Sequence, residues 1–168
     1  MRSPRSAPAA DPFAPEGVDF QPVSPRLITA RLLGGGLVNA VLVAVGITLG
    51  VLVSPWFHIM TVAGAALMAV ELWFIPRQVR AMGYALTEDH LLWRQGVMFR
   101  SVSVIPYGRM QFVDTSQGPL AARLGIAEVK LHTASAGTDA TIDGLPVDQA
   151  EHLRQVLSQR GEERMAGL

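Results

Sequence analysis

The sequence predicts a membrane protein with two parts, a helical transmembrane hairpin and a small domain of antiparallel strands closed by a C-terminal helix. Two observations predict this architecture. Residues 33–53 and 56–75 are each long and apolar enough to span a bilayer, and only Ser54 and Pro55 separate them. From Gly83 onward the hydrophobic period changes from helical to strand-like, with turn residues between short runs.

The first 31 residues are rich in proline and alanine. They include six prolines and few large apolar residues. They can therefore bury too little apolar surface to offset the entropy lost when the chain becomes ordered. We therefore expect residues 1–31 to form a disordered tail. A cleaved signal peptide would carry its apolar core earlier than this chain does, so we expect the hairpin, residues 32–76, to be retained.

The first apolar stretch is the clearest membrane span. Residues 33–53 contain no acidic or basic side chain and include twelve Leu, Ile and Val residues. Those residues contribute roughly −4 to −7 kcal/mol of apparent insertion free energy. A soluble protein of 168 residues is too small to bury two adjacent helices of this length on all sides. The lipid bilayer is thus the first partner that the sequence predicts.

Basic residues set the expected orientation. Arg26 and Arg31 precede the first span, Arg77 and Arg80 follow the second, and the turn has no basic residue. The positive-inside rule then places both termini in the cytoplasm of a multi-pass protein. Arginine outnumbers lysine thirteen to one, and alanine and glycine are abundant, which is typical of a GC-rich bacterial genome. We expect the bacterial plasma membrane.

Aromatic residues mark the two interfaces of the hairpin. Trp56 and Trp73 lie 17 residues apart, about 26 Å along a helix, which suits indole rings at opposite faces of a bilayer. Pro76 is expected to end the second span. Small residues recur at four-residue spacing and favour close packing within the hairpin, with packing between subunits of a homo-oligomer as the alternative. They are Gly36, Ala40, Ala44, Gly46, Gly50, Ala65 and Ala69.

Glu71 is the one formal charge inside either span. An ionisable group in lipid is usually functional, so Glu71 is a candidate proton or ion ligand. It also lies five residues before Pro76, near the interface, where a carboxylate can reach water or pair with Arg77 or Arg80. We favour the interfacial interpretation.

The domain is expected over residues 82–160, with a frayed C-terminus at 161–168. Asp148 and Glu151 have capping-box spacing ahead of an apolar helical stripe, which predicts an amphipathic C-terminal helix. A sheet of this kind with one helix over its open end is a small β-barrel or sandwich. The expected strands are 84–87, 90–94, 98–105, 111–115, 126–133 and 138–142.

Three sequence blocks carry a resemblance to a known family. They are IPYGRMQ at 105–111, QGPLAARLGIA at 117–127 and LHTAS at 131–135. In this order and spacing they resemble the bacterial pleckstrin-homology-like (PH-like) domain of YdbS-type membrane proteins, over about residues 84–157. Gly108 and Asp143 depart from the family pattern. The resemblance identifies as fold-defining the motif residues Pro106, Gln111, Gly118, Pro119, Leu120 and Gly125.

The resemblance implies an all-β or α+β split barrel, capped by the C-terminal helix, that serves as an interaction module and not as an enzyme. It also implies a larger membrane partner with related PH-like domains, and a link to resistance against antimicrobial peptides. From the residues themselves, Gly118 and Pro119 suit the start of a short helical turn, and Gly125 suits its left-handed end.

Arg109 and Arg123 are the candidate ligand or partner contacts, because guanidinium groups bind phosphate and carboxylate in pairs of hydrogen bonds. Each also has a structural interpretation, which we favour. Arg109 can bind a loop carbonyl or pair with Asp114, and Arg123 can cap the short helix before Gly125.

Other classes of function find no support. The chain has no cysteine, no catalytic or nucleotide-binding motif and no basic stripe for nucleic acid, so we expect no cofactor and no catalytic site. Residues 81–168 hold eight basic and ten acidic residues, which disfavours a lipid head-group sensor. We expect a scaffold, with a small transporter or export subunit using Glu71 as the alternative. Six histidines and aspartates of the domain are scattered, without the spacing of metal ligands. They are His90, His132, His152, Asp114, Asp139 and Asp143.

Overall fold

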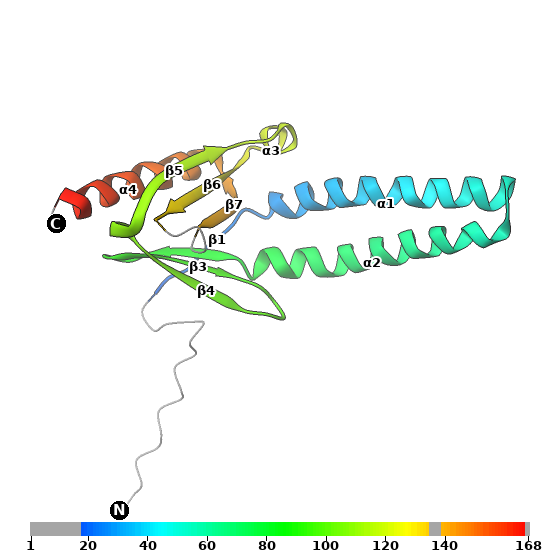
Figure 1. Cartoon of the computed structure of the whole chain (residues 1–168), viewed down its shortest axis with the longest axis horizontal. Helices are drawn as coiled ribbons and strands as arrows, with labels where there is room; N and C mark the ends of the chain where they lie inside the picture. Colours follow the sequence, from blue (N-terminus) through cyan, green and yellow to red (C-terminus); the bar gives the residue numbers. More distant parts are fainter. Residues whose placement is uncertain (1–17, 135–138, 167–168) are drawn as a thin grey trace, which may run out of the picture.

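A long helical hairpin and a β-rich domain at one end of it make up the molecule (Figure 1). The computed structural model describes residues 18–134 and 139–166. The described chain enters through a short strand in the domain, runs out and back along the hairpin, and then builds the two sheets. The described parts nearest to the two termini therefore both lie in the domain.

The hairpin consists of α1 (Arg26–Leu52), a short 3-10 turn η1 (Pro55–Phe57) and α2 (His58–Arg80). Both helices are long and apolar enough to cross a membrane. Large apolar side chains such as Leu37 and Val70 are exposed on their outer faces. These helices are therefore not the buried helices of a soluble core, because their apolar surface is left for lipid.

Glycines on α1 bring the two helices into close contact. A Cβ atom at Gly46 would lie 2.6 Å from the backbone nitrogen of Thr61, and one at Gly50 would lie 2.6 Å from Cε1 of His58. Only glycine allows such an approach. The predicted packing within the hairpin is confirmed at these two positions, whereas Gly36 has open space beside it.

The chain becomes ordered earlier than the sequence predicts. Strand β1 (Gln21–Pro22) pairs with β2 (Gly83–Leu86), and α1 begins at Arg26 instead of residue 32. Val23 and Leu27 are buried in the core of the domain. The predicted tail is thus wrong for residues 18–31, because these two apolar side chains offset the ordering of a proline-rich segment. The rest of that prediction, residues 1–17, lies outside the described residues.

The predicted end of the second span at Pro76 is also wrong. Pro76 lies inside α2, which continues to Arg80. Proline removes one backbone hydrogen bond from the ladder. The following turn stays helical because Val79 is buried against the domain.

Two antiparallel sheets form the domain. The order is β1-β2-β3-β4 in the first sheet and β5-β6-β7 in the second. Leu86 faces Leu91 across the first hairpin, and the Thr87 N–H donates to the carbonyl of His90, so a tight turn joins β2 and β3. The remaining strands are β3 (His90–Gln95), β4 (Ser101–Pro106), β5 (Met110–Ser116), β6 (Ile126–Thr133) and β7 (Ala140–Pro146).

Two strands differ from their predicted bounds by more than one residue. The strand expected at 98–105 begins at Ser101, because residues 96–100 form a loop that turns at Gly96 with φ +95°. The strand expected at 138–142 runs on to Pro146. Residue 138 lies outside the described residues, as does most of the turn expected before it.

The C-terminal helix α4 (Val147–Ala166) starts and ends differently from the expectation. It begins ahead of Asp148, and the Glu151 carboxylate accepts hydrogen bonds from Arg154 and Gln155, so the predicted capping box is replaced by contacts within the helix. The predicted fraying is wrong for residues 161–164, because these residues belong to α4. Arg164 there forms an ion pair with Asp89.

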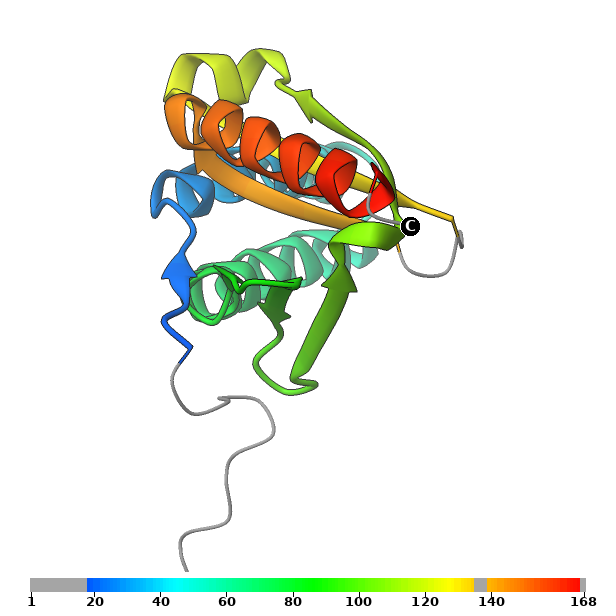
Figure 2. The same cartoon turned by 90° about the vertical axis from the view of Figure 1, so that its left-hand side faces the viewer.

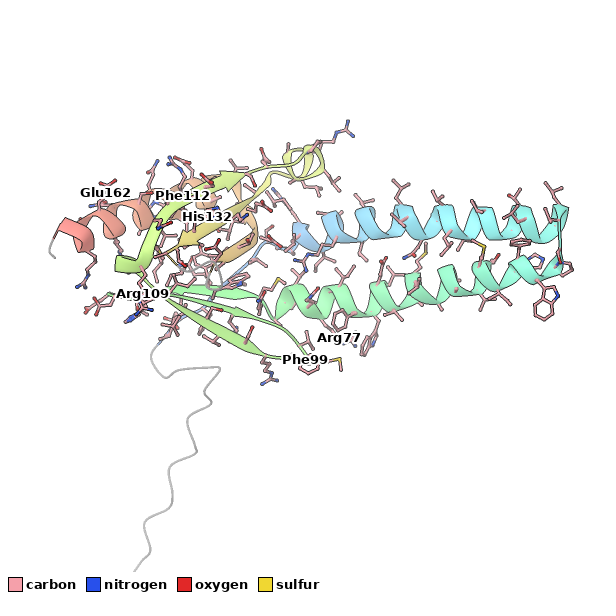
Figure 3. The ribbon with its side chains drawn as sticks, in the orientation of Figure 1. Arg77, Phe99, Arg109, Phe112, His132 and Glu162 are labelled. Atoms are coloured by element: carbon pink, nitrogen blue, oxygen red, sulfur yellow. The ribbon has the colours of Figure 1, made fainter. Side chains whose placement is uncertain are left out.

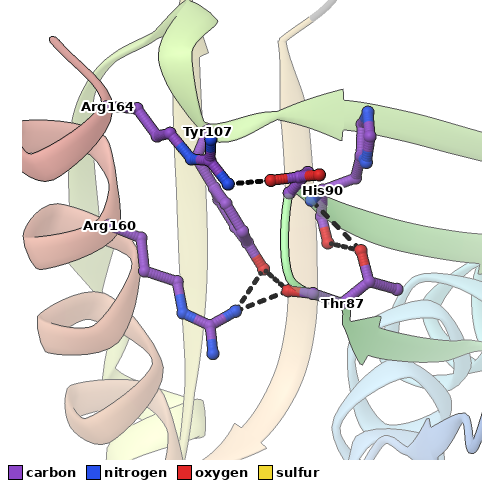
Figure 4. Close-up of polar contacts among 6 residues, drawn as sticks. Thr87, His90, Tyr107, Arg160 and Arg164 are labelled. Atoms are coloured by element: carbon purple, nitrogen blue, oxygen red, sulfur yellow. Dashed lines mark hydrogen bonds and ion pairs between the residues drawn. The ribbon is translucent and has the colours of Figure 1, made fainter. Parts of the chain in front are cut away.

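A buried polar network attaches α4 to the first sheet (Figure 4). The Tyr107 hydroxyl donates to the Thr87 carbonyl at 2.9 Å, and Arg160 Nη1 donates to that carbonyl at 2.6 Å and to the Tyr107 hydroxyl at 2.9 Å. Burial raises the pKa of Tyr107, and the hydrogen bond from Arg160 opposes the rise. The network fixes the second half of α4 over the β2–β3 turn.

One core joins the sheets, α4 and the root of the hairpin. Figure 2 looks from the domain end and shows α4 lying across the three-stranded sheet, with the hairpin behind. Leu27 and Val79 bring both transmembrane helices into the core, and Leu153 and Leu157 bring α4. The split barrel expected from the sequence is thus built directly on the hairpin.

Candidate functional site

The two candidate arginines lie at opposite ends of the domain. Arg123 is in α3 (Pro119–Leu124), which Figure 1 shows at the end nearest to the hairpin. Arg109 is in the 3-10 turn η2 (Tyr107–Arg109), and Figure 3 shows it toward the end farthest from the hairpin. They do not form one site.

Neither arginine makes its predicted structural contact. Both are exposed, and neither guanidinium forms a hydrogen bond or ion pair within residues 18–134 and 139–166. The carbonyl of Leu124, at the end of α3, instead accepts a hydrogen bond from Arg26 Nη1 at 3.2 Å. The cap that the sequence assigned to Arg123 is therefore supplied by Arg26, which lies 98 positions away from Leu124 in the chain.

The motif residues mainly shape the chain. Gly118 precedes α3, Pro119 takes its first position, and Gly125 ends it with φ +66° and ψ +33°. These positions confirm the predicted helix start and left-handed end. The other motif residues are Pro106, which ends β4, Gln111, which is exposed on β5, and Leu120, which is partly exposed on α3.

Glu71 does not pair with Arg77 or Arg80. Its carboxylate faces α1, where a Cβ atom at Gly35 would lie 2.6 Å from Oε1. Oε2 is buried and has no hydrogen-bond partner among the described residues. Arg77 instead donates to the Trp73 carbonyl and lies over the Trp73 ring. The interfacial pairing expected for Glu71 is wrong, because Gly35 leaves room for the carboxylate between the helices.

An ion pair secures the junction between hairpin and domain. Arg31 Nη2 lies 2.9 Å from Asp143 Oδ2, and Arg31 Nη1 donates to Gln78 at 2.9 Å. Arg31 and Asp143 border a cleft of about 650 Å³ between α1, α3 and the second sheet. Its arginine is already paired, so this cleft offers no free cation to a phosphate or carboxylate. Asp143 is thereby separated from the other two candidate aspartates.

Asp114 and Asp139 do come together, around His132. Asp139 Oδ2 lies 3.2 Å from His132 Nδ1, and Asp114 Oδ2 lies 3.8 Å from Nε2. A hydrogen bond from the Thr133 N–H, together with His132, lowers the pKa of Asp139. Within the part of the chain that the structure describes, no group of three or more such side chains is arranged to hold a metal ion.

An aromatic stack lies next to this cluster. The rings of Phe112 and His132 face one another across β5 and β6, with centroids 4.2 Å apart and planes 20° from parallel. Phe112 is 52% exposed. A large ring held rigidly and left open to solvent is the kind of side chain that anchors protein interfaces.

A groove of about 260 Å³ runs between β5 and α4 beside this stack. Figure 3 shows Phe112 and His132 on the sheet, with Glu162 of α4 toward the C-terminal end. β5 is the edge of its sheet, and no described strand pairs with its outer side. Such an edge can accept an extended peptide as an additional strand. The groove is lined by Met110, Gln111, Phe112, Val113, Leu157, Ser158, Gly161 and Glu162.

The sequence analysis did not find this groove. One signal for it was present. In alternating strands, Phe112 and His132 fall on outward positions, where a large aromatic ring is unusual. What the sequence did not contain was the pairing of Phe112 with His132, which depends on strand register.

The fold and the site together define a class, a membrane protein in which a helical hairpin carries a split barrel closed by a C-terminal helix. The profile of the family described as Bacterial PH domain matches residues 29–161, and the chain belongs to that family. It is 31% identical over 144 residues to the UPF0699 transmembrane protein YdbS of Bacillus subtilis (strain 168). That match covers 81% of this chain and 89% of the relative. No solved structure matched significantly.

Proposed function

We propose that this protein is a membrane-anchored interaction module, which crosses the bacterial plasma membrane twice and holds its PH-like domain at the cytoplasmic face to bind a membrane partner. The observation that carries the proposal is the unpaired edge of β5, bordered by the groove against α4 and by the exposed Phe112 ring.

The attachment of the hairpin supports this function. Leu27 and Val79 are buried in the domain, and Arg31 is paired with Asp143. The domain is therefore held in one orientation instead of hanging from a flexible linker. Confinement beside the membrane raises its effective concentration for membrane-bound partners, and a fixed orientation reduces the entropy lost on binding.

The chemistry of the groove specifies the occupant. The apolar floor at Phe112 and Leu157 fits alternate apolar side chains of an extended strand. Glu162, which lines the groove, and Asp114, two residues after Phe112 on β5, favour a cation in the same segment. We propose an extended segment of a larger membrane protein with related PH-like domains, acting in envelope or antimicrobial-peptide stress defence. A second copy of this chain is the competing occupant.

Site-directed cross-linking tests the proposal, because the native chain has no cysteine. A Gln111→Cys variant carrying a benzophenone should cross-link in native membranes to one membrane protein, through a peptide that mass spectrometry identifies. Adding Phe112→Asp should abolish most of the adduct, because a charge replaces the ring in the groove.

The matched control is Gln155→Cys, on the exposed face of α4. It should not give this adduct. The proposal fails if both probes yield the same products, or if Phe112→Asp leaves the adduct unchanged. An adduct between two copies of this chain would replace the hetero-partner with a homo-oligomer.

Orientation has its own test. Ser54→Cys lies in the turn of the hairpin, and Gln155→Cys lies on the domain. An impermeant thiol reagent added to intact cells should label the first variant alone. Labelling of the second alone would place the domain outside the cytoplasm.

A second candidate function depends on Glu71. Its buried Oε2 atom without a partner, inside the hairpin, favours a small transporter or export subunit in which a proton or ion binds there. Glu71→Gln keeps the shape and removes the charge. The interaction module predicts unchanged cross-linking from Gln111→Cys and unchanged resistance to antimicrobial peptides, whereas the transporter predicts loss of resistance alone.

A third function, a lipid head-group sensor, gains least from the structure. Arg109 lies far from the hairpin, and Arg31 is already paired. Of the two arginines proposed from the sequence, only Arg123 lies at the end of the domain that faces the membrane.

A further inference from the structure

The loop that joins β3 and β4 presents an exposed apolar tip. Residues 96–100 form this loop, in which Met98 is 76% exposed and Phe99 is 88% exposed. No other large apolar side chain among those described is as exposed as Phe99, including those on the lipid-facing surface of the hairpin. A soluble surface rarely presents two such side chains side by side.

The conformation of the loop is fixed by its own backbone. Gly96 has φ +95°, and a Cβ atom there would lie 1.9 Å from the carbonyl oxygen of Phe99. Gln95 and Ser101 pair directly across its base. Gly96 and the Gln95–Ser101 pair therefore hold the backbone of Phe99 at the tip of a closed turn.

The position of the loop relative to the hairpin identifies what the tip meets. Figure 1 shows the β3–β4 hairpin pointing along α2, past its domain end, toward the membrane-spanning part. Figure 3 shows Phe99 and Arg77 at the same level along the long axis. Arg77 lies over the ring of Trp73, which is 59% exposed, and such a pair is typical of the bilayer interface. The tip is therefore at the depth of the interface.

The charges near the tip suit the same partner. Arg100 follows Phe99 directly and is exposed. A second projection, α3, lies at the same end of the domain and also combines an apolar side chain with a cation, Leu120 at 36% exposure and Arg123. Apolar side chains beside arginines are the pattern of segments that enter the acyl boundary while their cations stay among anionic head groups.

We infer that the 96–100 loop inserts Met98 and Phe99 into the leaflet next to the domain, with Arg100 among the head groups. The occupant of this surface is lipid. The loop adds an attachment point to the two helix roots, so the domain cannot rock about the hairpin. The inference does not depend on the β5 groove, which lies on a different surface.

Depth-dependent fluorescence quenching tests the inference on the full-length protein. A Val97→Cys variant retains both apolar tip residues and carries a bimane label beside them. In nanodiscs of phosphatidylcholine and phosphatidylglycerol, spin-labelled lipid should quench this label, and aqueous iodide should quench it little. Adding Phe99→Asp should reverse that preference. Adding Phe112→Asp, the matched change of an exposed ring on β5, should leave it unchanged.

Three results would overturn the inference. The first is quenching of the label by iodide and not by lipid. The second is a label shielded from both quenchers, which would place a protein surface over the loop. The third is an equal effect of Phe99→Asp and Phe112→Asp on the quenching. Circular dichroism of each variant shows that the domain is folded. If Phe99→Asp unfolds the domain, Arg100→Glu replaces it and should shift quenching from lipid toward iodide in the anionic nanodiscs.

Discussion

The end of the domain beside the hairpin and the end away from it expose different side chains. Beside the hairpin, the 96–100 loop and α3 each present an apolar side chain and an arginine. Away from it, an exposed aromatic stack lies beside the β5 groove, with Glu162 in the groove lining and Asp114 next to His132 of the stack. One end suits an anionic membrane surface, and the other suits a protein segment that carries a cation.

The difference shows why a nearly neutral domain need not be inert. Residues 81–168 hold eight basic and ten acidic side chains, so their net charge is close to zero. From the sequence, this small net charge disfavoured lipid contact. The structure separates these charges by position. Arg31 and Asp143 at the junction compensate each other, whereas Arg100 and Glu162 are both exposed. Figure 3 shows Glu162 and Phe99, the neighbour of Arg100 in sequence, at opposite ends of the domain.

The largest expected effect concerns the packing of α1 in the core of the domain. This packing fixes both ends of the domain relative to the membrane. Leu27→Ala removes a buried side chain that packs against Gly144, where a Cβ atom would lie 2.7 Å away. We expect it to cost about 2–5 kcal/mol of unfolding free energy. Guanidinium denaturation in detergent, followed by the fluorescence of buried Trp93, measures the change.

The control for this junction is Leu37→Ala, on the exposed face of α1. It removes the same atoms without leaving a cavity in the domain, so the midpoint should move little. Equal shifts for the two variants would mean that α1 is not part of the domain core, and the two ends would then have no fixed orientation.

The next largest effect concerns the wall of the groove. Arg160→Ala removes the hydrogen bonds to the Thr87 carbonyl and to the Tyr107 hydroxyl. Loss of a charged donor from a part-buried network should cost about 1.5–3 kcal/mol. Cross-linking from Gln111→Cys should weaken in parallel, because the second half of α4 loses its attachment.

Arg164→Ala is the comparison for this network. It removes an exposed ion pair with Asp89 on the same helix, and exposed pairs contribute about 0–1 kcal/mol. An Arg164→Ala variant as unstable as Arg160→Ala would show that the exposed pair, and not the buried network, holds α4 in place.

Much of this architecture follows from local sequence signals. Alternation placed five of the six predicted strands within about three residues of their bounds, and the Gly118-Pro119 start and Gly125 end of α3 are where the turn chemistry puts them. These features depend on neighbours in sequence, so composition and spacing are sufficient to identify them.

The errors lie where contacts join distant parts of the chain. Proline content hid the two buried residues Val23 and Leu27, which share a core with residues far along the chain; Leu27 lies against Gly144. Arg26 binds the end of α3, and Arg31 binds Asp143, although both arginines had only been assigned to membrane orientation. A charge pattern gives the sign of a residue but not its partner, because the partner is fixed by tertiary packing.

A smaller effect is expected inside the hairpin. The comparison assigns binding to the two ends of the domain and none to Glu71. An ionised carboxylate buried without a partner is costly, so Glu71→Gln should leave stability unchanged or raise it by about 1 kcal/mol. Thermal unfolding in detergent measures this. A clear loss of stability would mean that the carboxylate binds a proton or ion that the amide cannot replace.

The smallest effect distinguishes the acidic residues of α4. Hydrogen bonds from Arg154 and Gln155 lower the pKa of Glu151 from 4.5 to about 2. A depressed pKa in the folded protein stabilises it above pH 4.5, and this contribution disappears as pH falls toward 2. Glu151→Gln should therefore flatten the decline in melting temperature between these values. Glu162→Gln should instead weaken cross-linking from Gln111→Cys, because that carboxylate has no partner among the described residues and lines the groove. Unchanged cross-linking in the Glu162→Gln variant would mean that this carboxylate does not select a cationic segment.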